Sequence, residues 1–329
     1  MQYNKIFSLS PTLFLEIVRI RAGLTNCVLP QQLYESKFQI DLSNLVSAFL
    51  NGLVDAEKLE RRISEVENRI KEELKSNEIR EILNELDIDI LPFCVVVNRI
   101  LSSKHLPIFP EVQYYVYEMS KENKVRRGLK KTRKLEMKIL RGENSLKNRM
   151  RIIKIEGGLL GYPKCCVDEF LRLKKKAILS GNFTPEKNII VELLDIEVYN
   201  KLPKIFSNLS FEDFFYSLFT SNFYPCSIEC KKAIKIGKMC EDYLEKYPEY
   251  KKAYRCRLFF NIFYQLVTGY KSYLLLKNAN TEHSEYSKKV VNHFNSLKPD
   301  VEEILSAAKN VITDVEFGNE FIKKCMINL

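Results

Sequence analysis

EVQYYVYEM, residues 111–119, carries the clearest β-strand pattern in this chain of 329 residues. Val112, Tyr114 and Val116 share one face, and Tyr115 and Tyr117 share the other, because side chains alternate along a strand. The long segments before and after this stretch have helical spacing instead. The sequence therefore predicts a small β element within a chain that is otherwise rich in helices.

A helical pattern precedes the strand, between about 41 and 86. Its apolar residues recur at steps of four and three, which is the spacing of one helix face: Leu59, Ile63, Val66, Ile70 and Leu74. The chain has only 11 Gly and 11 Pro, which is few for the many turns of a β-sandwich. We predict a mainly α fold, a helix-rich α+β arrangement whose small β element lies near 111–119.

Prolines interrupt the chain after the first helical region. Pro92, Pro107 and Pro110 indicate a boundary near 105–110. We expect two parts: an N-terminal helical region at 1–105 without a chemical motif, and a cysteine-motif domain at 106–329 with a basic helix within 121–154 and C-terminal helices.

The sequence predicts neither an export signal nor a membrane segment. The first apolar stretch contains charged residues, and the most apolar window, LFFNIFYQLVTGY (258–270), is too short to span a bilayer and predicts a core helix. We expect a cytoplasmic protein, whose nine cysteines are then thiols or metal ligands.

Two similar segments, YPKCC (162–166) and YPCSIEC (224–230), carry the most informative cysteines. In each, Tyr-Pro leads into cysteine at an expected helix start, where free backbone N–H groups favour a thiolate. The thiolate is the form of cysteine that binds metals and acts as a nucleophile. Both segments are therefore candidates for a chemical role.

Helix geometry selects four of the nine cysteines. Cys226 and Cys230 are four residues apart, so we expect them on one face of a helix, where they can share a metal. Cys240 would lie about 15 Å further along that helix, and Cys256 would be level with Cys240, so both are expected to be packing residues. The candidate metal ligands are Cys165, Cys166, Cys226 and Cys230, and the candidate cofactor is zinc or an iron–sulfur cluster.

Other assignments of these four thiols stay open. They could be buried packing residues, redox-active thiols or partners in a disulfide. If a metal binds, Glu229, Asp168, a water or a histidine could supply a ligand. The histidines, His105, His283 and His293, are dispersed along the chain, which favours ordinary polar roles for them.

The stretch GGLLGYPKCCVDEFL and, about sixty residues later, FYPCSIEC resemble an archaeal family known as domain of unknown function 483. Members of that family have a similar Gly-Tyr-Pro-x-Cys-Cys helix start and a downstream Pro-Cys segment with a further cysteine. The resemblance covers about 110–250 and implies a shared site without naming a reaction. The residues that it carries over are Gly161, Tyr162, Pro163, Cys165, Cys166, Pro225, Cys226 and Cys230.

Positive charge is concentrated in residues 121–154, which have fourteen Lys or Arg and three Glu, a net of +11 against +10 for the whole chain. This concentration favours a face that binds RNA or another polyanion, and the preceding tyrosines could stack on unpaired bases. The alternative is a solvated lysine-rich helix face with the tyrosines in a sheet core. The basic stretch has no large apolar face, so it does not indicate a membrane partner. The candidate nucleic-acid-binding residues are Arg126, Arg127, Lys130, Lys131, Arg133 and Lys134.

Three functional hypotheses follow from these patterns. The first is a protein that binds a metal ion or iron–sulfur cluster through the two Tyr-Pro-Cys segments and a polyanion through its basic face. The second is a cysteine-thiolate redox or transfer enzyme, and the third is a nucleic-acid-binding accessory protein with structural cysteines. The sequence has no P-loop, dinucleotide Gly fingerprint, HExxH or GxSxG, so it gives no support for ATP, NAD or common hydrolase chemistry. It leaves open whether the protein is an enzyme and what its oligomeric state is.

Overall fold

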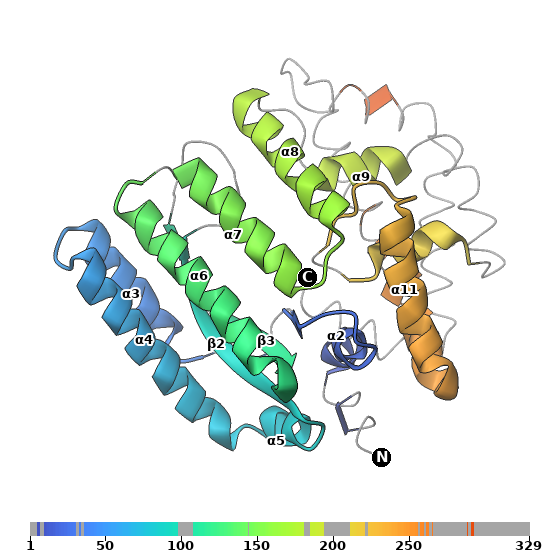
Figure 1. The fold of residues 1–329 in the computed structure, drawn as a ribbon, viewed down its shortest axis with the longest axis horizontal. Helices are drawn as coiled ribbons and strands as arrows, with labels where there is room; N and C mark the ends of the chain where they lie inside the picture. Colours follow the sequence, from blue (N-terminus) through green and yellow to red (C-terminus); the bar gives the residue numbers. More distant parts are fainter. Residues whose placement is uncertain are drawn as a thin grey trace. The chain divides into compact units, whose positions relative to one another are not determined.

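The computed structural model describes residues 5–6, 10–30, 33, 36–97, 108–143, 145–180, 185–193, 211–220, 223–255, 257–259, 261–262, 265, 288 and 291–292. The chain forms two compact units, residues 1–167 and 168–329. The fold is mainly α with a small three-stranded antiparallel sheet, as the sequence predicts (Figure 1).

The sheet belongs to the first unit and has the strand order β1-β3-β2. Its strands are β1 (Cys27–Val28), β2 (Ile88–Val97) and β3 (Ile108–Glu118), and β3 confirms the strand predicted near 111–119. Strands β2 and β3 pair from Ile88↔Glu118 to Val97↔Ile108, on the two sides of the boundary expected near 105–110. Both sides of that expected boundary therefore lie in one unit, and the two units meet in the sequence at 167 and 168.

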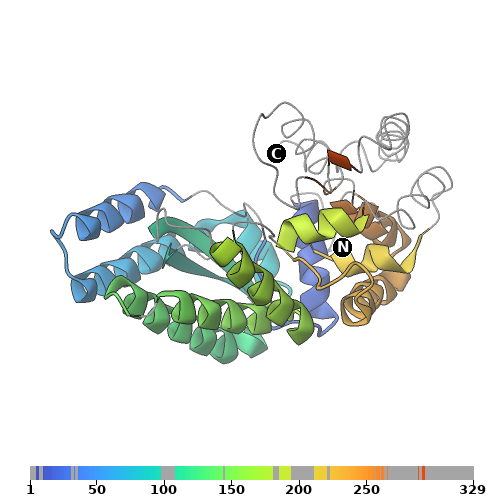
Figure 2. The same ribbon diagram turned by 90° about the horizontal axis from the view of Figure 1, so that it is seen from above.

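Helices surround this sheet in the first unit. They are α2 (Pro11–Arg21), α3 (Gln39–Leu50), α4 (Ala56–Glu73), α5 (Glu78–Asn84), α6 (Glu122–Leu140) and α7 (Ser145–Leu159). The apolar stripe predicted for α4 is confirmed, since Leu59, Ile63, Val66 and Ile70 are buried, and Leu74 is buried in the short 3₁₀ turn that follows. Helices α3 and α4 run side by side, and so do α6 and α7 (Figures 1 and 2).

Strand β2 was not predicted from the sequence. Pro92 stands in its middle, and proline cannot donate a hydrogen bond to a neighbouring strand. Because β2 pairs only with β3 among the described strands, it lies at an edge of the sheet, where a proline is tolerated if its nitrogen faces away from the partner. Pro92 therefore interrupts the sequence pattern without interrupting the strand.

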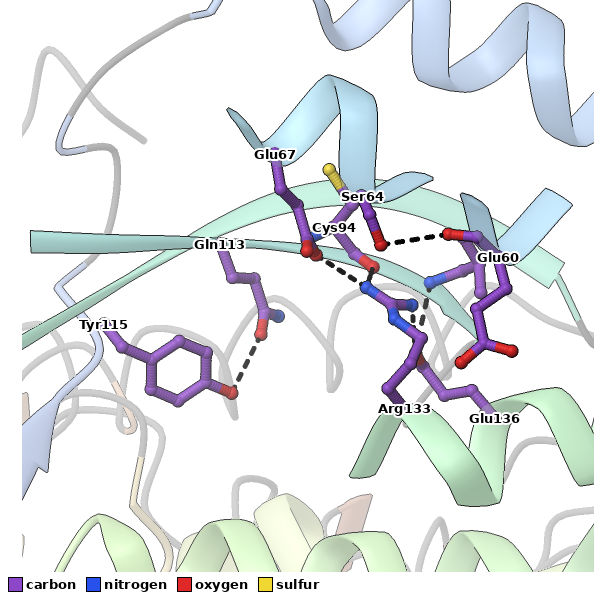
Figure 3. Close-up of polar contacts among 9 residues, drawn as sticks. Glu60, Ser64, Glu67, Cys94, Gln113, Tyr115, Arg133 and Glu136 are labelled. Carbon is purple, nitrogen blue, oxygen red and sulfur yellow. Dashed lines mark hydrogen bonds and ion pairs between the residues drawn. The ribbon is translucent and has the colours of Figure 1, made fainter. Parts of the chain in front are cut away.

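Side chains from α4 and α6 cover the outer edge of β2 (Figure 3). The backbone N–H of Cys94 donates to Glu67 at 2.8 Å, and the N–H of Val96 donates to Glu136 at 3.4 Å. Arg133 donates to the carbonyl oxygen of Cys94 at 2.6 Å and to Glu67 at 2.7 Å, and it also pairs with Glu136. These contacts satisfy backbone groups that an uncovered edge would offer to another chain.

Helix α8 (Lys164–Ser180) begins in the first unit and continues into the second. The second unit also contains α9 (Pro185–Leu193), the 3₁₀ segment η3 (Asp213–Leu218) and α11 (Lys231–Tyr243). Helix α11 packs closely on η3, and Phe211, Phe215 and Phe259 form an aromatic cluster beside them, with ring centroids 4.8–5.1 Å apart. The predicted apolar window 258–270 and the expected C-terminal helices lie largely outside the described residues. In the part of the chain that is described, no helix combines the length and apolar character needed to cross a membrane.

Candidate metal centre and basic helix

Gly161 forms the turn between α7 and α8. Its φ of +69° lies in the left-handed region, which favours glycine. A Cβ atom at this position would come within 2.5 Å of the carbonyl oxygen of Leu24. The turn then ends at Pro163, whose carbonyl oxygen accepts from the backbone N–H groups of Cys166 and Val167 at 2.9 and 3.1 Å. Helix α8 begins at Lys164, so the helix start predicted at YPKCC is confirmed.

A buried ion pair on α2 supports this turn. Arg19, with 2 % of its surface exposed, pairs with Glu16 at 3.0 Å and donates a hydrogen bond to the carbonyl oxygen of Leu160. Its guanidinium also lies over the ring of Tyr162, 5.5 Å from the ring centroid. This pair was not predicted from the sequence, although Glu16 and Arg19 within the apolar stretch LFLEIVRIR were a usable signal, because a charge buried on a core helix needs a partner.

The second cysteine segment does not form the helix that was expected. Cys226 and Cys230 were predicted on one helix face, but α11 begins only at Lys231, and Cys230 is its N-cap residue with an extended ψ of 104°. The segment before it is a turn in which the N–H of Cys230 donates to the carbonyl oxygen of Ser227 at 3.0 Å. A turn also brings residues four apart close together. The prediction that Cys226 and Cys230 lie close together is therefore confirmed, whereas the predicted helical conformation is wrong.

Glu192 of α9 holds this turn. One carboxylate oxygen accepts from the backbone N–H of Ile228 at 2.7 Å, and the other accepts from Asn188 at 2.7 Å. Burial raises the pKa of Glu192, and its hydrogen bonds with Ile228, Ser227 and Asn188 oppose that rise. Sequence reasoning missed Glu192, because nothing in the spacing of α9 distinguishes this glutamate from a solvated one.

The sulfur atoms of Cys165, Cys166, Cys226 and Cys230 all lie within 4.8 Å of one another. The two sulfurs of the adjacent pair, Cys165 and Cys166, are 3.9 Å apart. Cys166 is buried, whereas Cys165 and Cys226 are partly exposed. Cys165 lies in the first turn of α8 and Cys230 caps α11, so each segment places a cysteine at a helix N-terminus. Four such sulfurs could hold a metal ion.

The remaining described cysteines are buried in the core. Cys240 is fully buried on α11, which agrees with its predicted packing role. Burial raises the pKa of Cys27 to about 12 and also raises the pKa of Cys94 above its ordinary value, so neither offers a thiolate at neutral pH. Cys256 and the three histidines lie outside the described residues.

Helix α6 contains the six residues predicted to bind nucleic acid, and five of them lie at its surface. Arg127, Lys130, Lys131 and Lys134 are exposed, and Arg126 is partly exposed and pairs with Glu122 at 2.6 Å. Arg133 is different, because it is buried and holds the edge of β2, so its assignment to a nucleic-acid-binding face is wrong. It cannot contact a ligand from the position in which it pairs with two glutamates.

The tyrosines before α6 do not form a stacking surface. Tyr114, Tyr115 and Tyr117 are at most 5 % exposed. Tyr115 and Tyr117 pack in the apolar cluster that β2 and β3 form with Val125 and Leu129 of α6. The alternative prediction, that these tyrosines belong to a sheet core, is confirmed.

Comparison with known proteins identifies part of the chain. Residues 110–257 match the family described as "Protein of unknown function (DUF483)", a range that includes both cysteine segments and α6. No curated protein and no solved structure matches the chain. The resemblance seen in GYPKCC and FYPCSIEC is thus confirmed: residues 110–257 match the DUF483 family.

Proposed function

We propose that Cys165, Cys166, Cys226 and Cys230 bind one zinc ion through four thiolates. The observation that carries this proposal is the mutual separation of the four sulfurs, at most 4.8 Å. A tetrahedral zinc ion with Zn–S bonds of about 2.3 Å holds its sulfurs about 3.8 Å apart. The separation of 3.9 Å between the sulfurs of Cys165 and Cys166 is close to this value.

Zinc is favoured over a four-iron cluster by the same separation. In such a cluster each cysteine binds a different iron, so the four sulfurs lie further apart than around a single ion. Four protein ligands also leave no open position on a tetrahedral ion, which is typical of structural zinc sites. The zinc would therefore stabilise the local fold of the two cysteine segments and would not bind a substrate directly.

The first prediction concerns metal content. Protein purified without oxygen and with a reducing agent should contain one zinc per chain, measured by elemental analysis. Cys226→Ser and Cys230→Ser should each lose most of this zinc, because serine is a poor zinc ligand. Cys240→Ala is the matched control, since Cys240 is a buried cysteine of the same region outside the cluster, and it should keep its zinc.

Two results would contradict the zinc assignment. Iron with visible absorption in place of zinc would indicate an iron–sulfur cluster at the same cysteines. A colourless protein without metal, in which all four thiols react freely with a thiol reagent, would remove the metal site altogether. If the serine variants do not fold, titrating the wild-type thiols with a mercurial reagent and counting released zinc gives the same stoichiometry.

A second prediction tests Glu192, which we propose as the residue that positions the Cys226–Cys230 turn for metal binding. Glu192→Ala removes the acceptor of the Ile228 N–H, and losses of this kind around a zinc site typically weaken metal affinity by about 10- to 100-fold. Glu192→Gln keeps an oxygen that can accept this hydrogen bond and should stay near the wild-type affinity. Competition with a chromogenic chelator measures both values. Equal affinities for the alanine variant and the wild type would show that the turn holds its shape without Glu192.

We further propose that the exposed side of α6 binds a polyanion. The supporting observation is that Lys124, Arg127, Lys130, Lys131 and Lys134 are all exposed on this one helix. Among the described residues, none of the five takes part in an ion pair. Clustered, uncompensated cations of this kind attract polyanions in a salt-dependent manner.

A further inference from the structure

The basic surface of the first unit continues from α6 to its neighbour α7. We define the basic face by six exposed residues: Lys124, Arg127, Lys130, Lys131 and Lys134 on α6, and Arg151 on α7. The two helices run side by side in both views (Figures 1 and 2). The basic face therefore consists of a row of cations on α6 and one further cation on the neighbouring helix.

The row on α6 has a fixed direction because the opposite side of this helix is buried. On α6 the residues Val125, Leu129 and Thr132 are covered, and on α7 Ile152 is fully buried. Lys124, Arg127, Lys131 and Lys134 follow one another at steps of three and four, so they project from one side of α6 over about 15 Å. A rigid row suits a partner whose charges are themselves rigidly spaced.

The basic face lacks aromatic side chains that could stack on unpaired bases. Neither α6 nor α7 contains Phe, Tyr or Trp, and the tyrosines of β3 are buried. Affinity for single strands normally depends on aromatic side chains that stack on bases. Lysine side chains instead contact phosphates, which position a nucleic acid without reading its sequence. The chemistry of this face therefore favours a partner that presents phosphates alone.

The shape of α6 and its neighbours favours an A-form duplex. A helix that reads B-form DNA enters the major groove, whereas α6 lies beside α7 and packs on α4, β2 and β3, so its exposed side is part of a two-helix surface. A-form RNA presents a wide, shallow minor groove that proteins recognise by shape and phosphate contacts. We propose that the basic face binds double-stranded RNA through its phosphates, an inference that rests on the proposed polyanion-binding role of α6.

Fluorescence anisotropy with four probes tests this proposal: a labelled RNA duplex, one of its single strands, a DNA duplex of the same sequence, and heparin. We expect the RNA duplex to bind most tightly of the three nucleic acids, independently of its sequence. The logarithm of the affinity should fall linearly with the logarithm of salt concentration. Lys131→Ala with Lys134→Ala should lower the magnitude of this slope by about 2, and Arg151→Ala by about 1.

Lys58→Ala with Arg61→Ala is the matched control, because it removes two exposed cations from α4 and keeps good helix formers. The control should leave duplex affinity and slope unchanged, and an equal loss in the control would overturn the assignment of this face. Equal or tighter binding of the single strand or of the DNA duplex would also overturn the RNA-duplex proposal, while leaving the polyanion role of α6 intact. If neither heparin nor any nucleic acid binds at low salt, the polyanion role itself fails.

Discussion

Replacing Arg133 by methionine is expected to lower the free energy of unfolding of the first unit by about 3–5 kcal/mol. The guanidinium of Arg133 pairs with Glu136, which is fully buried, and with Glu67 at 2.7 Å. Removing it leaves the buried carboxylate of Glu136 and the partly buried carboxylate of Glu67 without their cation, and it leaves the carbonyl oxygen of Cys94 without its donor. Methionine preserves most of the side-chain volume, so the expected loss reflects the missing charge and hydrogen bonds.

Urea unfolding, followed by circular dichroism, measures this effect. Arg127→Met is the matched control, since Arg127 is an exposed arginine on the same helix, and its replacement should change stability by less than about 0.5 kcal/mol. Adding Glu136→Gln to Arg133→Met should recover part of the loss, because a neutral amide costs less to bury than an unpaired carboxylate. A loss below about 1 kcal/mol for Arg133→Met would show that water or rearrangement compensates the two glutamates.

The ion pairs of Arg133 with Glu67 and Glu136 could not be predicted from the sequence, unlike the buried face of α4. The periodicity of Leu59, Ile63 and Val66 predicts the buried face of α4, because burial on a helix leaves a periodic trace. An arginine on α6 leaves no such trace when it is buried by pairing with glutamates from two helices. Arg133 was predicted to lie with the exposed lysines because of its charge alone, and only the three-dimensional structure shows that it is buried.

Strand β2 and the second cysteine segment illustrate a related limit. Pro92 argues against a strand unless the strand is known to lie at a sheet edge, and edge position depends on how distant segments pair. Similarly, the i to i+4 spacing of Cys226 and Cys230 fits both a helix turn and an irregular turn. The hydrogen bond from the N–H of Ile228 to Glu192, 36 residues earlier, helps to hold the turn. The residue types of the site were predictable, whereas the residues that hold them in place were not.

Gly161→Ala is expected to lower the free energy of unfolding by about 2–5 kcal/mol, combining left-handed backbone strain with a steric clash. Gly52→Ala separates these two contributions. Gly52 has a φ of +71°, close to the +69° of Gly161, but a Cβ at Gly52 would meet nothing within 4 Å. The control should therefore lose only about 1–2 kcal/mol, which is the cost of the left-handed conformation for a residue with a Cβ.

The clash at Gly161 also has a consequence for the sulfur cluster. The new Cβ would lie 2.5 Å from a backbone oxygen of Leu24, which cannot rotate away as a side chain can, so the turn itself must move. Because Cys165 and Cys166 follow this turn directly, we expect Gly161→Ala to lower zinc content under competition with a chelator, whereas Gly52→Ala should not. Equal stability losses in the two variants would show that the turn accommodates a Cβ, and the close approach to Leu24 would then not constrain the start of α8.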